Sequence, residues 1–343
     1  MKTLVTGGAG FIGSHVVRGL IDDGVEVRVL HLEGEPLTNL DGLDVEFVAG
    51  DITEPESVRR AVSGCDRVFH LAAIYALWLP RPELMREVNV EGTRNVLRAA
   101  GEAGVRKVVH TSSIAVCGGQ GLDTDATEES PFALGKTGEL YCQTKYESHQ
   151  LALEFARDGL DVSICCPTIP YGPGDRGPTP TGRFLLEAVQ MPVVFHPASV
   201  NNIVDVRDVA RGHLLAAQRG RSGESYLLGH QNVPLGELVR LALEVVGRRA
   251  VVLRTPYPAL WAWSQLASMN TRWISRRAPV LTPQALVGLR LGTRADCSKA
   301  FTQLGHSGRP VEQTLRDALC WFARAGYIRR DSVREHLLAV AEE

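Results

Sequence analysis

Short apolar runs and helix-spaced apolar positions alternate along the first two thirds of the chain. The apolar runs predict buried strands at residues 2–6, 25–31, 45–51, 66–73, 105–113, 161–167 and 224–230. Apolar positions three and four residues apart predict helices at 11–24, 56–64, about 83–103 and from 139 onward. This alternation is typical of an α/β fold whose parallel sheet is covered by helices on both faces. Such folds bind ligands at the carboxyl ends of their strands.

The pattern changes after residue 167. Residues 167–183 are rich in proline and glycine and predict an ordered loop that leaves the sheet. Strand-like and helical patterning returns at 201–228, and the chain is mostly helical from about 232. We therefore expect a first domain of residues 1–170, to which 201–228 return, and a smaller second domain of residues 171–200 and 229–343. The aromatic-rich segment 257–273 fits the core of the second domain better than a membrane surface, because only a few basic residues lie near it, namely Arg272, Arg276 and Arg277.

Glycines occupy the turn between the first strand and the first helix. The segment TGGAGFIG, residues 6–13, contains Gly8-x-Gly10-x-x-Gly13 and also Gly7-x-x-Gly10-x-x-Gly13. Such a turn needs backbone conformations that other residues resist, and it lets the backbone approach a pyrophosphate at a helix N-terminus. Because these glycines follow a strand and open a helix, they predict a dinucleotide-binding site.

The end of the second strand indicates which dinucleotide is preferred. A carboxylate at this place binds the ribose 2′-hydroxyl of NAD, whereas an arginine accommodates the 2′-phosphate of NADP. Residues 31–40 lack Lys and Arg, contain Glu33 and Glu35, and offer His31 as the one candidate cation. We therefore expect NAD, with NADP as the alternative and Arg28 as the first cation upstream. Asp51 follows the third strand and can accept from the adenine amino group or cap the next helix.

Several further motifs carry a resemblance to a known family. They are HLAA (70–73), NVEGT (89–93), TSSIAVCG (111–118), YCQTK (141–145), YGPGD (171–175) and IVDVRDVA (203–210), with TGGAGFIG and GDI (50–52) before them. In this order the chain resembles the extended short-chain dehydrogenases/reductases, the NAD-dependent epimerase/dehydratase family. AAIYALW (72–78) and PTPTGR (178–183) are similar to the dihydroflavonol-reductase-like group and to hopanoid-associated sugar epimerases. The resemblance implies a Rossmann-type doubly wound parallel sheet with a smaller, mostly helical C-terminal domain that binds substrate.

The resemblance also assigns roles to single residues. It implies a catalytic set of Ser113, Tyr141 and Lys145. Thr111 and Ser112 precede this serine and could be mistaken for it. Tyr141 and Lys145 share a helix face, and we expect the Lys145 ammonium and a positive nicotinamide to lower the tyrosine pKa from about 10. The implied cofactor-binding residues are Gly7, Gly10, Phe11, Ile12, Gly13, His31, Asp51, Ile52, Leu71, Ala72, Ala73, Tyr141, Lys145, Pro167 and Thr168.

Other polar residues near these motifs are expected to be structural. His70 is interpreted as a hydrogen-bonded histidine at a strand end, and Asp205 and Asp208 as residues that organise a strand-to-helix turn. Asn89 resembles the buried asparagine of the family, and a structural role for it is at least as well supported as a chemical one.

The predicted substrate pocket favours one of two chemistries. Members that act on nucleotide sugars usually carry an asparagine just before the proline at position 167, and this chain has Cys166 there. The expected walls of the pocket are apolar or aromatic: Tyr75, Trp78, Ile169, Pro170 and Tyr171, with Ser113 at its base. We therefore expect an NAD(P)-dependent carbonyl reductase for a lipophilic or aromatic molecule. Arg176 and Arg183 keep a nucleotide-sugar epimerase/dehydratase as the alternative, and the intact serine, tyrosine and lysine disfavour a binding protein without activity.

Composition excludes several other functions. The 343 residues carry a formal net charge of −2, so we expect no nucleic-acid partner. No apolar run of about 18 residues and no export signal occur, so we expect a cytoplasmic protein without a membrane partner. The seven cysteines show no CxxC spacing and predict reduced thiols and no metal site. By the resemblance, the helices that begin near 83 and 139 would form a homodimer interface.

Overall fold

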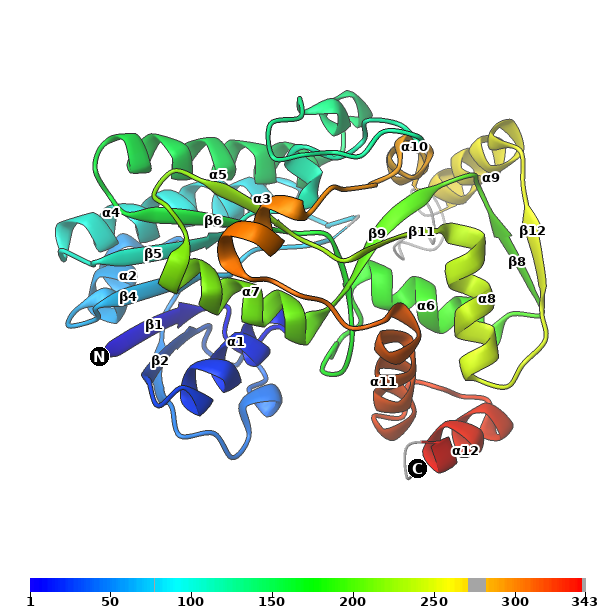
Figure 1. Cartoon of the computed structure of the whole chain (residues 1–343), viewed down its shortest axis with the longest axis horizontal. Coiled ribbons are helices and arrows are strands. Elements are labelled where there is room, and N and C mark those ends of the chain that lie inside the picture. The colour runs from blue at the N-terminus through cyan, green and yellow to red at the C-terminus, as the bar shows by residue number, and fades with distance from the viewer. Residues whose placement is uncertain (77, 271–281, 341–343) are drawn as a thin grey trace.

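A seven-stranded parallel sheet forms the larger part of the molecule. The computed structural model describes residues 1–76, 78–270 and 282–340. The strand order is β10-β6-β5-β4-β1-β2-β3, and each neighbouring pair is parallel (Figure 1). The bounds are β1 (Lys2–Thr6), β2 (Glu26–His31), β3 (Glu46–Ala49), β4 (Arg67–His70), β5 (Lys107–Thr111), β6 (Val162–Pro167) and β10 (Ser225–Leu228). The order reverses between β1 and β4, which makes that crevice the expected ligand site.

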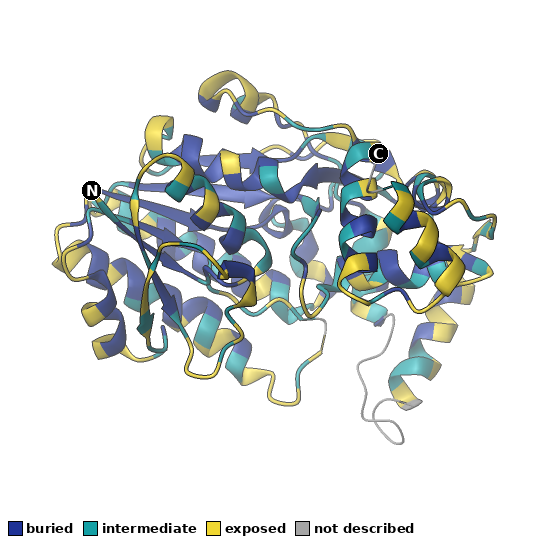
Figure 2. Cartoon of the chain, turned by 90° about the horizontal axis from the view of Figure 1, so that it is seen from below, coloured by how far each residue is buried: buried dark blue, intermediate teal, exposed yellow. Residues whose placement is uncertain are grey.

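Helices cover both faces of this sheet, as the sequence pattern predicts. Helices α1 (Phe11–Asp22) and α7 (Val206–Arg219) pack together on one face. Helices α2 (Pro55–Val62), α4 (Thr93–Glu102) and α5 (Leu140–Arg157) cover the other. The strands between them are largely buried (Figure 2). The predicted Rossmann-type sheet is therefore confirmed.

The helix predicted at 83–103 is interrupted. It begins as α3 (Glu83–Arg86), continues as the π-helical turn η2 (Glu87–Gly92), and becomes α4. In this turn the hydroxyl of Thr93 donates to the carbonyl of Asn89 at 2.7 Å, and the Asn89 side chain bonds the backbone of Ile74. Isolated π turns inside α-helices often occur at functional sites, and this one holds a segment that follows β4.

A smaller part lies beyond the carboxyl ends of the main sheet. Its strands form a three-stranded sheet of order β11-β9-β7 and a two-stranded sheet of β8 and β12. The bounds are β7 (Ile169–Tyr171), β8 (Val193–His196), β9 (Val200–Asp205), β11 (Gln231–Pro234) and β12 (Val251–Arg254). Its helices are α6 (Pro180–Gln190), α8 (Leu235–Val245), α9 (Tyr257–Asn270), α10 (Pro283–Leu291), α11 (Val311–Arg324) and α12 (Asp331–Val340).

Residues 201–228, expected to return to the first domain, divide between the two parts. Helix α7 and strand β10 lie on the main sheet. Strand β9 instead joins the small sheet, because both of its edges pair, with β7 and with β11. The short turn η6 (Ala300–Leu304) packs back against α7, so the chain crosses between the parts more often than the sequence pattern suggests.

The prediction that residues 257–273 belong to a core is wrong for most of helix α9. Leu260 and Ser264 are buried, whereas Trp261, Trp263 and Leu266 are 46%, 48% and 65% exposed. The apolar side chains of this helix are distributed around its whole circumference, and only one narrow stripe of them can pack against the rest of the protein. Residues 271–273 and the three arginines at 272, 276 and 277 lie outside the described residues.

Candidate active site

One cavity of about 790 Å³ extends along the carboxyl ends of the strands from the glycine turn to the small domain. Nearly all of the predicted site residues line it: Gly7, Gly10, Phe11, Ile12, Gly13, Asp51, Ile52, Leu71, Ala72, Ala73, Tyr75, Ser113, Tyr141, Lys145, Pro167, Thr168, Ile169, Pro170 and Tyr171. His31 and Trp78 do not line it. The His31 ring contacts the Leu32 carbonyl and the edge of Phe47, and Trp78 is 39% exposed.

The glycine turn brings bare backbone to the cavity. Gly7 has φ +68°, and a Cβ on it would lie 2.7 Å from the amide nitrogen of Ala72. A Cβ on Gly13 would lie 2.0 Å from the Gly7 carbonyl oxygen. Helix α1 begins at Phe11 with Gly10 as its N-cap and without a side-chain cap. Free amide groups at a helix N-terminus suit a pyrophosphate, so these residues fit a dinucleotide.

The side chains that follow strands β2 and β3 at the cavity are acidic, and the nearby arginine is paired with other residues. Glu35 lines the cavity, and its carboxylate accepts from the Leu32 amide at 3.1 Å. Asp51 also lines it, and one of its oxygens accepts from the Thr53 amide at 2.8 Å. The N-cap of helix α2 is Glu54, so the capping role considered for Asp51 as the alternative to adenine binding is not found. Arg28 pairs with Glu46 at 3.0 Å and donates to the Ala61 carbonyl, so this cation is occupied away from the cavity.

Hydrogen bonds distinguish the three neighbouring hydroxyl groups that follow β5. The Thr111 hydroxyl bonds Nε2 of His213 at 3.0 Å, and the Ser112 hydroxyl bonds Nδ1 of His149 at 2.9 Å. Ser113 Oγ accepts from the Ala115 amide at 3.2 Å, and its hydroxyl also forms a hydrogen bond with the Tyr141 phenol. Ser113 is thus directed at Tyr141, whereas its two neighbours are directed at histidines, which supports Ser113 as the reactive serine.

Tyr141 and Lys145 lie on successive turns of α5 and both line the cavity. The Lys145 ammonium donates to the Thr111 carbonyl at 2.6 Å, and burial lowers the pKa of Lys145 to about 8. Burial raises the pKa of Tyr141, and a hydrogen bond with Ser113 acts in the opposite direction. We expected Lys145, together with a positive nicotinamide, to lower the pKa of Tyr141. In the protein without cofactor Lys145 does not do so, because its ammonium is directed at a backbone carbonyl.

The residues predicted to be structural have structural contacts. Asn89 accepts from the Ile74 amide at 2.7 Å and donates to the Ile74 carbonyl at 3.0 Å, which fixes the cavity wall that continues into Tyr75. His70 is held between the hydroxyl groups of Thr6 and Thr93 at 2.8 and 2.9 Å. These contacts agree with the interpretation of His70 and favour the structural role for Asn89.

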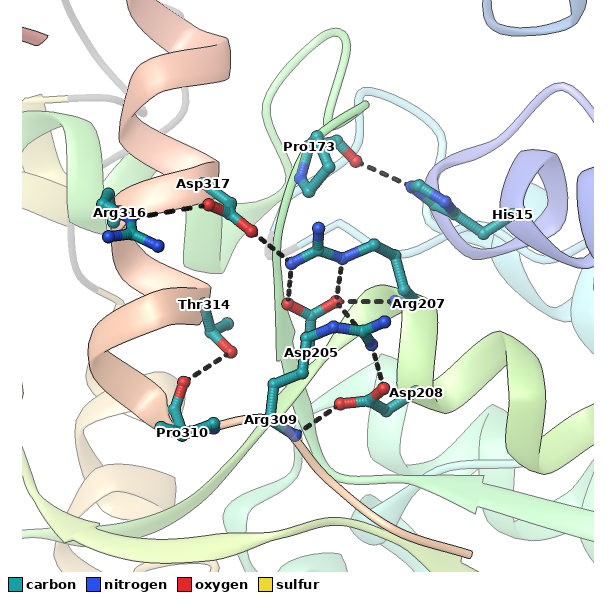
Figure 3. A network of polar contacts seen from close by, with 10 residues as sticks. All are labelled: His15, Pro173, Asp205, Arg207, Asp208, Arg309, Pro310, Thr314, Arg316 and Asp317. Atoms are coloured by element: carbon teal, nitrogen blue, oxygen red, sulfur yellow. Dashed lines mark hydrogen bonds and ion pairs between the residues drawn. The ribbon is translucent and has the colours of Figure 1, made fainter. Parts of the chain in front are cut away.

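Asp205 and Asp208 organise the junction of β9 and α7, also as predicted. Asp205 accepts from the Arg207 amide at 2.8 Å and pairs with the Arg207 guanidinium, which reaches Asp317 on α11 at 2.5 Å (Figure 3). Asp208 pairs with Arg309. In the same view, His15 of α1 contacts the Pro173 carbonyl at 2.9 Å. These contacts connect the small domain to the helices of the main sheet beside the cavity.

Several lining residues were not identified from the sequence. Glu139 precedes Tyr141 by two residues and could have been noticed from its place in GELYC. Phe184 of α6, Leu238 of α8, and Gly288 and Leu289 of α10 also line the cavity. No local pattern marks these four as neighbours of α5, because the chain brings them there through the small domain.

Comparisons with known proteins agree with this geometry. The model of the "NAD dependent epimerase/dehydratase family" matches residues 3–229. The chain is 36% identical to a dihydroflavonol 4-reductase-like protein of Synechocystis sp., over 95% of each chain. It is 31% identical to the 4-hydroxy-2-methyl-3-oxo-4-farnesyl-3,4-dihydroquinoline-1-oxide ketoreductase of Stigmatella aurantiaca, over 95% of this chain and 98% of that one.

The fold has a solved counterpart as well. The crystal structure of a nucleoside-diphosphate-sugar epimerase from Pseudomonas aeruginosa superposes with a TM-score of 0.78 at 25% identity, over 96% of this chain and 99% of that one. Family match, whole-length relatives and fold agree with one another. The chain therefore belongs to the NAD-dependent epimerase/dehydratase family of extended short-chain dehydrogenases/reductases, and it is an NAD(P)-dependent oxidoreductase.

Proposed function

We propose that this enzyme reduces a ketone or aldehyde group of a lipophilic or aromatic small molecule, using Ser113, Tyr141 and Lys145. The observation that carries the proposal is the lining of the cavity beyond the serine. It consists mainly of apolar side chains, among them Ile169, Phe184, Leu238 and Leu289. Among the described residues that line the cavity, Lys145 is the only cation. A pocket of this kind favours neutral apolar ligands over charged ones.

Each of the three side chains has a separate role in the proposed carbonyl reduction. A nicotinamide cofactor, when bound, would supply the hydride for the carbonyl carbon. Ser113 donates a hydrogen bond to the carbonyl oxygen and polarises it. Tyr141 gives its proton to the same oxygen as the alcohol forms. The raised pKa of Tyr141, caused by burial, keeps the phenol protonated at neutral pH, which is the form that this step requires.

Lys145 has a positioning task in the proposed site. Its ammonium is buried, and the Thr111 carbonyl holds it on the same face of α5 as Tyr141. From there it can donate to the ribose of the cofactor, as the family resemblance implies. The pKa of about 8 leaves most of the lysine charged at neutral pH.

A nucleotide-sugar epimerase or dehydratase is the second candidate, favoured by the likeness to a nucleoside-diphosphate-sugar epimerase. A sugar diphosphate needs cations or amides around its charge. Arg176 donates to the Asn39 side chain at 3.0 Å, and neither Arg176 nor Arg183 lines the cavity. Cys166, where such enzymes present an amide, is buried within the core below the site. The named reductase and ketoreductase relatives support the first candidate.

A substrate panel tests the proposal. The purified protein is incubated with NADH or NADPH and lipophilic ketones, aldehydes and nucleotide sugars, and cofactor absorbance is followed. We expect cofactor oxidation with at least one class of lipophilic carbonyl. Epimerisation of a nucleotide sugar without net cofactor oxidation, combined with no turnover of any carbonyl, would favour the second candidate and overturn the first.

We further propose that NAD(H) is the preferred cofactor. Glu35 lines the cavity after β2, and Arg28 is paired elsewhere, so a ribose 2′-phosphate would meet a carboxylate and no described cation. We predict kcat/KM at least about tenfold higher with NADH than with NADPH, equal to about 1.4 kcal/mol. Glu35→Gln should narrow the ratio, and Glu33→Gln, an exposed neighbour, should leave it unchanged. A tenfold preference for NADPH would refute the prediction.

The domain division and the oligomeric state follow the same proposal. Residues 1–170, with most of 201–228, would hold the cofactor, and 171–200 with 229–343 would enclose the substrate. Helices α4 and α5 pack side by side on one face of the sheet and would form a homodimer interface, as the resemblance implies.

In the part of the chain that the structure describes, no helix combines the length and the apolar character needed to cross a membrane.

A further inference from the structure

Glu139 is a cavity-lining carboxyl group that the proposed reaction does not use. It is the N-cap residue of α5, yet its side chain makes no capping hydrogen bond. The contact described for its carboxylate is the Cys142 thiol, which donates weakly to Oε2 at 3.7 Å. No Lys or Arg among the described residues forms an ion pair with it. The carboxyl group therefore faces the cavity without a strong partner from the protein.

The surroundings of Glu139 make this arrangement costly for the folded protein. Ala115, Leu134 and Cys142 form a buried apolar cluster, against which Tyr141 packs. Burial raises the pKa of Glu139, because an apolar environment disfavours the charged form. A carboxyl group that lines a cavity and has its pKa shifted by burial is a candidate for a functional contact. Glu139 and Tyr141 line the same cavity, and the charge of Glu139 acts on the Tyr141 phenol, so such a ligand contact would lie near the reacting centre.

We propose that Glu139 determines substrate specificity by accepting a hydrogen bond from a hydroxyl group of the substrate, away from the reacting carbonyl, and by excluding substrates with negative charge there. The inference rests on the proposed carbonyl reduction and names the substrate class further: a neutral, hydroxylated, otherwise lipophilic ketone or aldehyde. A neutral hydroxyl fits better than an ammonium group, because Lys145 already places a positive charge in the same cavity and a second cation would have to be desolvated.

Because Tyr75 and Tyr141 form walls of the cavity, the hydroxylated part of the substrate is expected to be planar or cyclic. Their ring centroids lie 4.6 Å apart at 45°, and both residues line the cavity. Aromatic walls orient a flat apolar body, and a single acceptor at its edge then selects where its hydroxyl lies. Specificity of this type depends on one hydrogen bond inside an apolar site, where an analogue without the hydroxyl leaves the acceptor unpaired.

Matched ketones test the inference. The first probe set is benzylacetone with its para-hydroxy and para-carboxy derivatives, whose substituents lie far from the carbonyl, and the same pairing is applied to each ketone of the substrate panel that the wild-type enzyme reduces. We expect wild-type kcat/KM to favour the hydroxylated member over the unsubstituted one by about tenfold or more, mainly through KM, and to be lowest for the carboxylate. Because ratios within one set are compared, an effect on the Tyr141 pKa cancels.

Variants separate the inference from a structural role. Glu139→Leu should abolish the hydroxyl preference while turnover of the unsubstituted ketone is kept. Glu139→Gln, which retains an acceptor oxygen without the charge, should keep part of the preference and raise kcat/KM for the carboxylate about tenfold relative to the unsubstituted ketone. Glu154→Gln, an exposed position on the same helix, is the matched control and should change no ratio.

The outcomes of this test are distinguishable. Equal kcat/KM for hydroxylated and unsubstituted ketones in the wild-type enzyme, or a hydroxyl preference that survives in Glu139→Leu, overturns the inference and leaves carbonyl reduction standing. Absence of turnover of every ketone and aldehyde overturns the proposed function, and the inference with it. If Glu139→Leu does not fold, Glu139→Gln decides through the carboxylate ratio alone.

Discussion

Replacing Tyr141 by phenylalanine should lower kcat for carbonyl reduction by at least about a hundredfold, the usual scale for a positioned proton donor. The substitution removes the phenolic hydroxyl and keeps the ring that packs against Tyr75 at 4.6 Å. Ser113 and Lys145 keep their own backbone contacts, with Ala115 and Thr111, so the cavity should retain its shape. Cofactor affinity, measured by fluorescence titration, should therefore change little.

Tyr146 provides the matched control for this prediction. It lies on the same helix, stacks on Phe132 at 4.2 Å, and is not part of the cavity lining. Tyr146→Phe should leave kcat within about twofold of the wild-type value, since the hydroxyl removed there faces no substrate. A Tyr141→Phe enzyme with near-wild-type kcat would show that another group delivers the proton and would remove Tyr141 from the proposed set.

Where periodicity and local motif agree, the sequence predicts the fold closely. Strands β1, β2 and β6 lie inside the predicted runs, because apolar residues flanked by glycine or helix-forming segments leave few alternatives. The run at 66–73 is longer than strand β4, which ends at His70. The last three residues, Leu71 to Ala73, leave the sheet and line the cavity, a use that apolar character alone does not distinguish from a strand.

Predictions that needed long-range information were less successful. The aromatic content of α9 indicated a core, but burial depends on what packs against each face, and Trp261 and Trp263 are exposed. His31 and Trp78 were assigned to the site by position along the chain, and neither lines the cavity: the His31 ring contacts Phe47, and Trp78 is 39% exposed. Motifs at strand ends were identified correctly as cavity residues, since parallel strands bring their carboxyl ends together.

Replacing Arg207 by methionine should destabilise the folded protein by about 3–5 kcal/mol, the range for breaking a buried ion pair on one side. Asp205 is fully buried, and Arg207 supplies it with two side-chain hydrogen bonds, at 2.8 and 2.6 Å. The same guanidinium reaches Asp317 on α11, so its loss also weakens the connection between the two parts of the molecule (Figure 3). Denaturant unfolding at pH 7 measures the free-energy difference.

The stability difference between Arg207→Met and the wild-type protein should depend on pH. Burial by itself raises the pKa of Asp205, but hydrogen bonds from Arg207 outweigh it and leave the pKa below its ordinary value. In the wild-type protein the pair therefore stabilises the fold above the unfolded pKa of about 3.9, and this stabilisation is lost as pH falls through the lower folded pKa. Arg207→Met removes both guanidinium hydrogen bonds to Asp205, and leaves the amide of residue 207 at 2.8 Å and the more distant Arg309 at 4.0 Å to act against burial. The pKa of Asp205 should then rise, and the stability gap to wild type should narrow as pH falls from 7 towards 5.

Arg316→Met is the matched control, because it removes the same group from an exposed position. Arg316 is 52% exposed and lies 3.8 Å from Asp317, a pair of the kind that contributes about 0–1 kcal/mol. Its loss should shift the unfolding free energy by no more than that, without a change between pH 7 and 5. If Arg207→Met and Arg316→Met are equally stable, the Asp205 carboxylate has found another partner, and the connection between β9, α7 and α11 does not depend on Arg207.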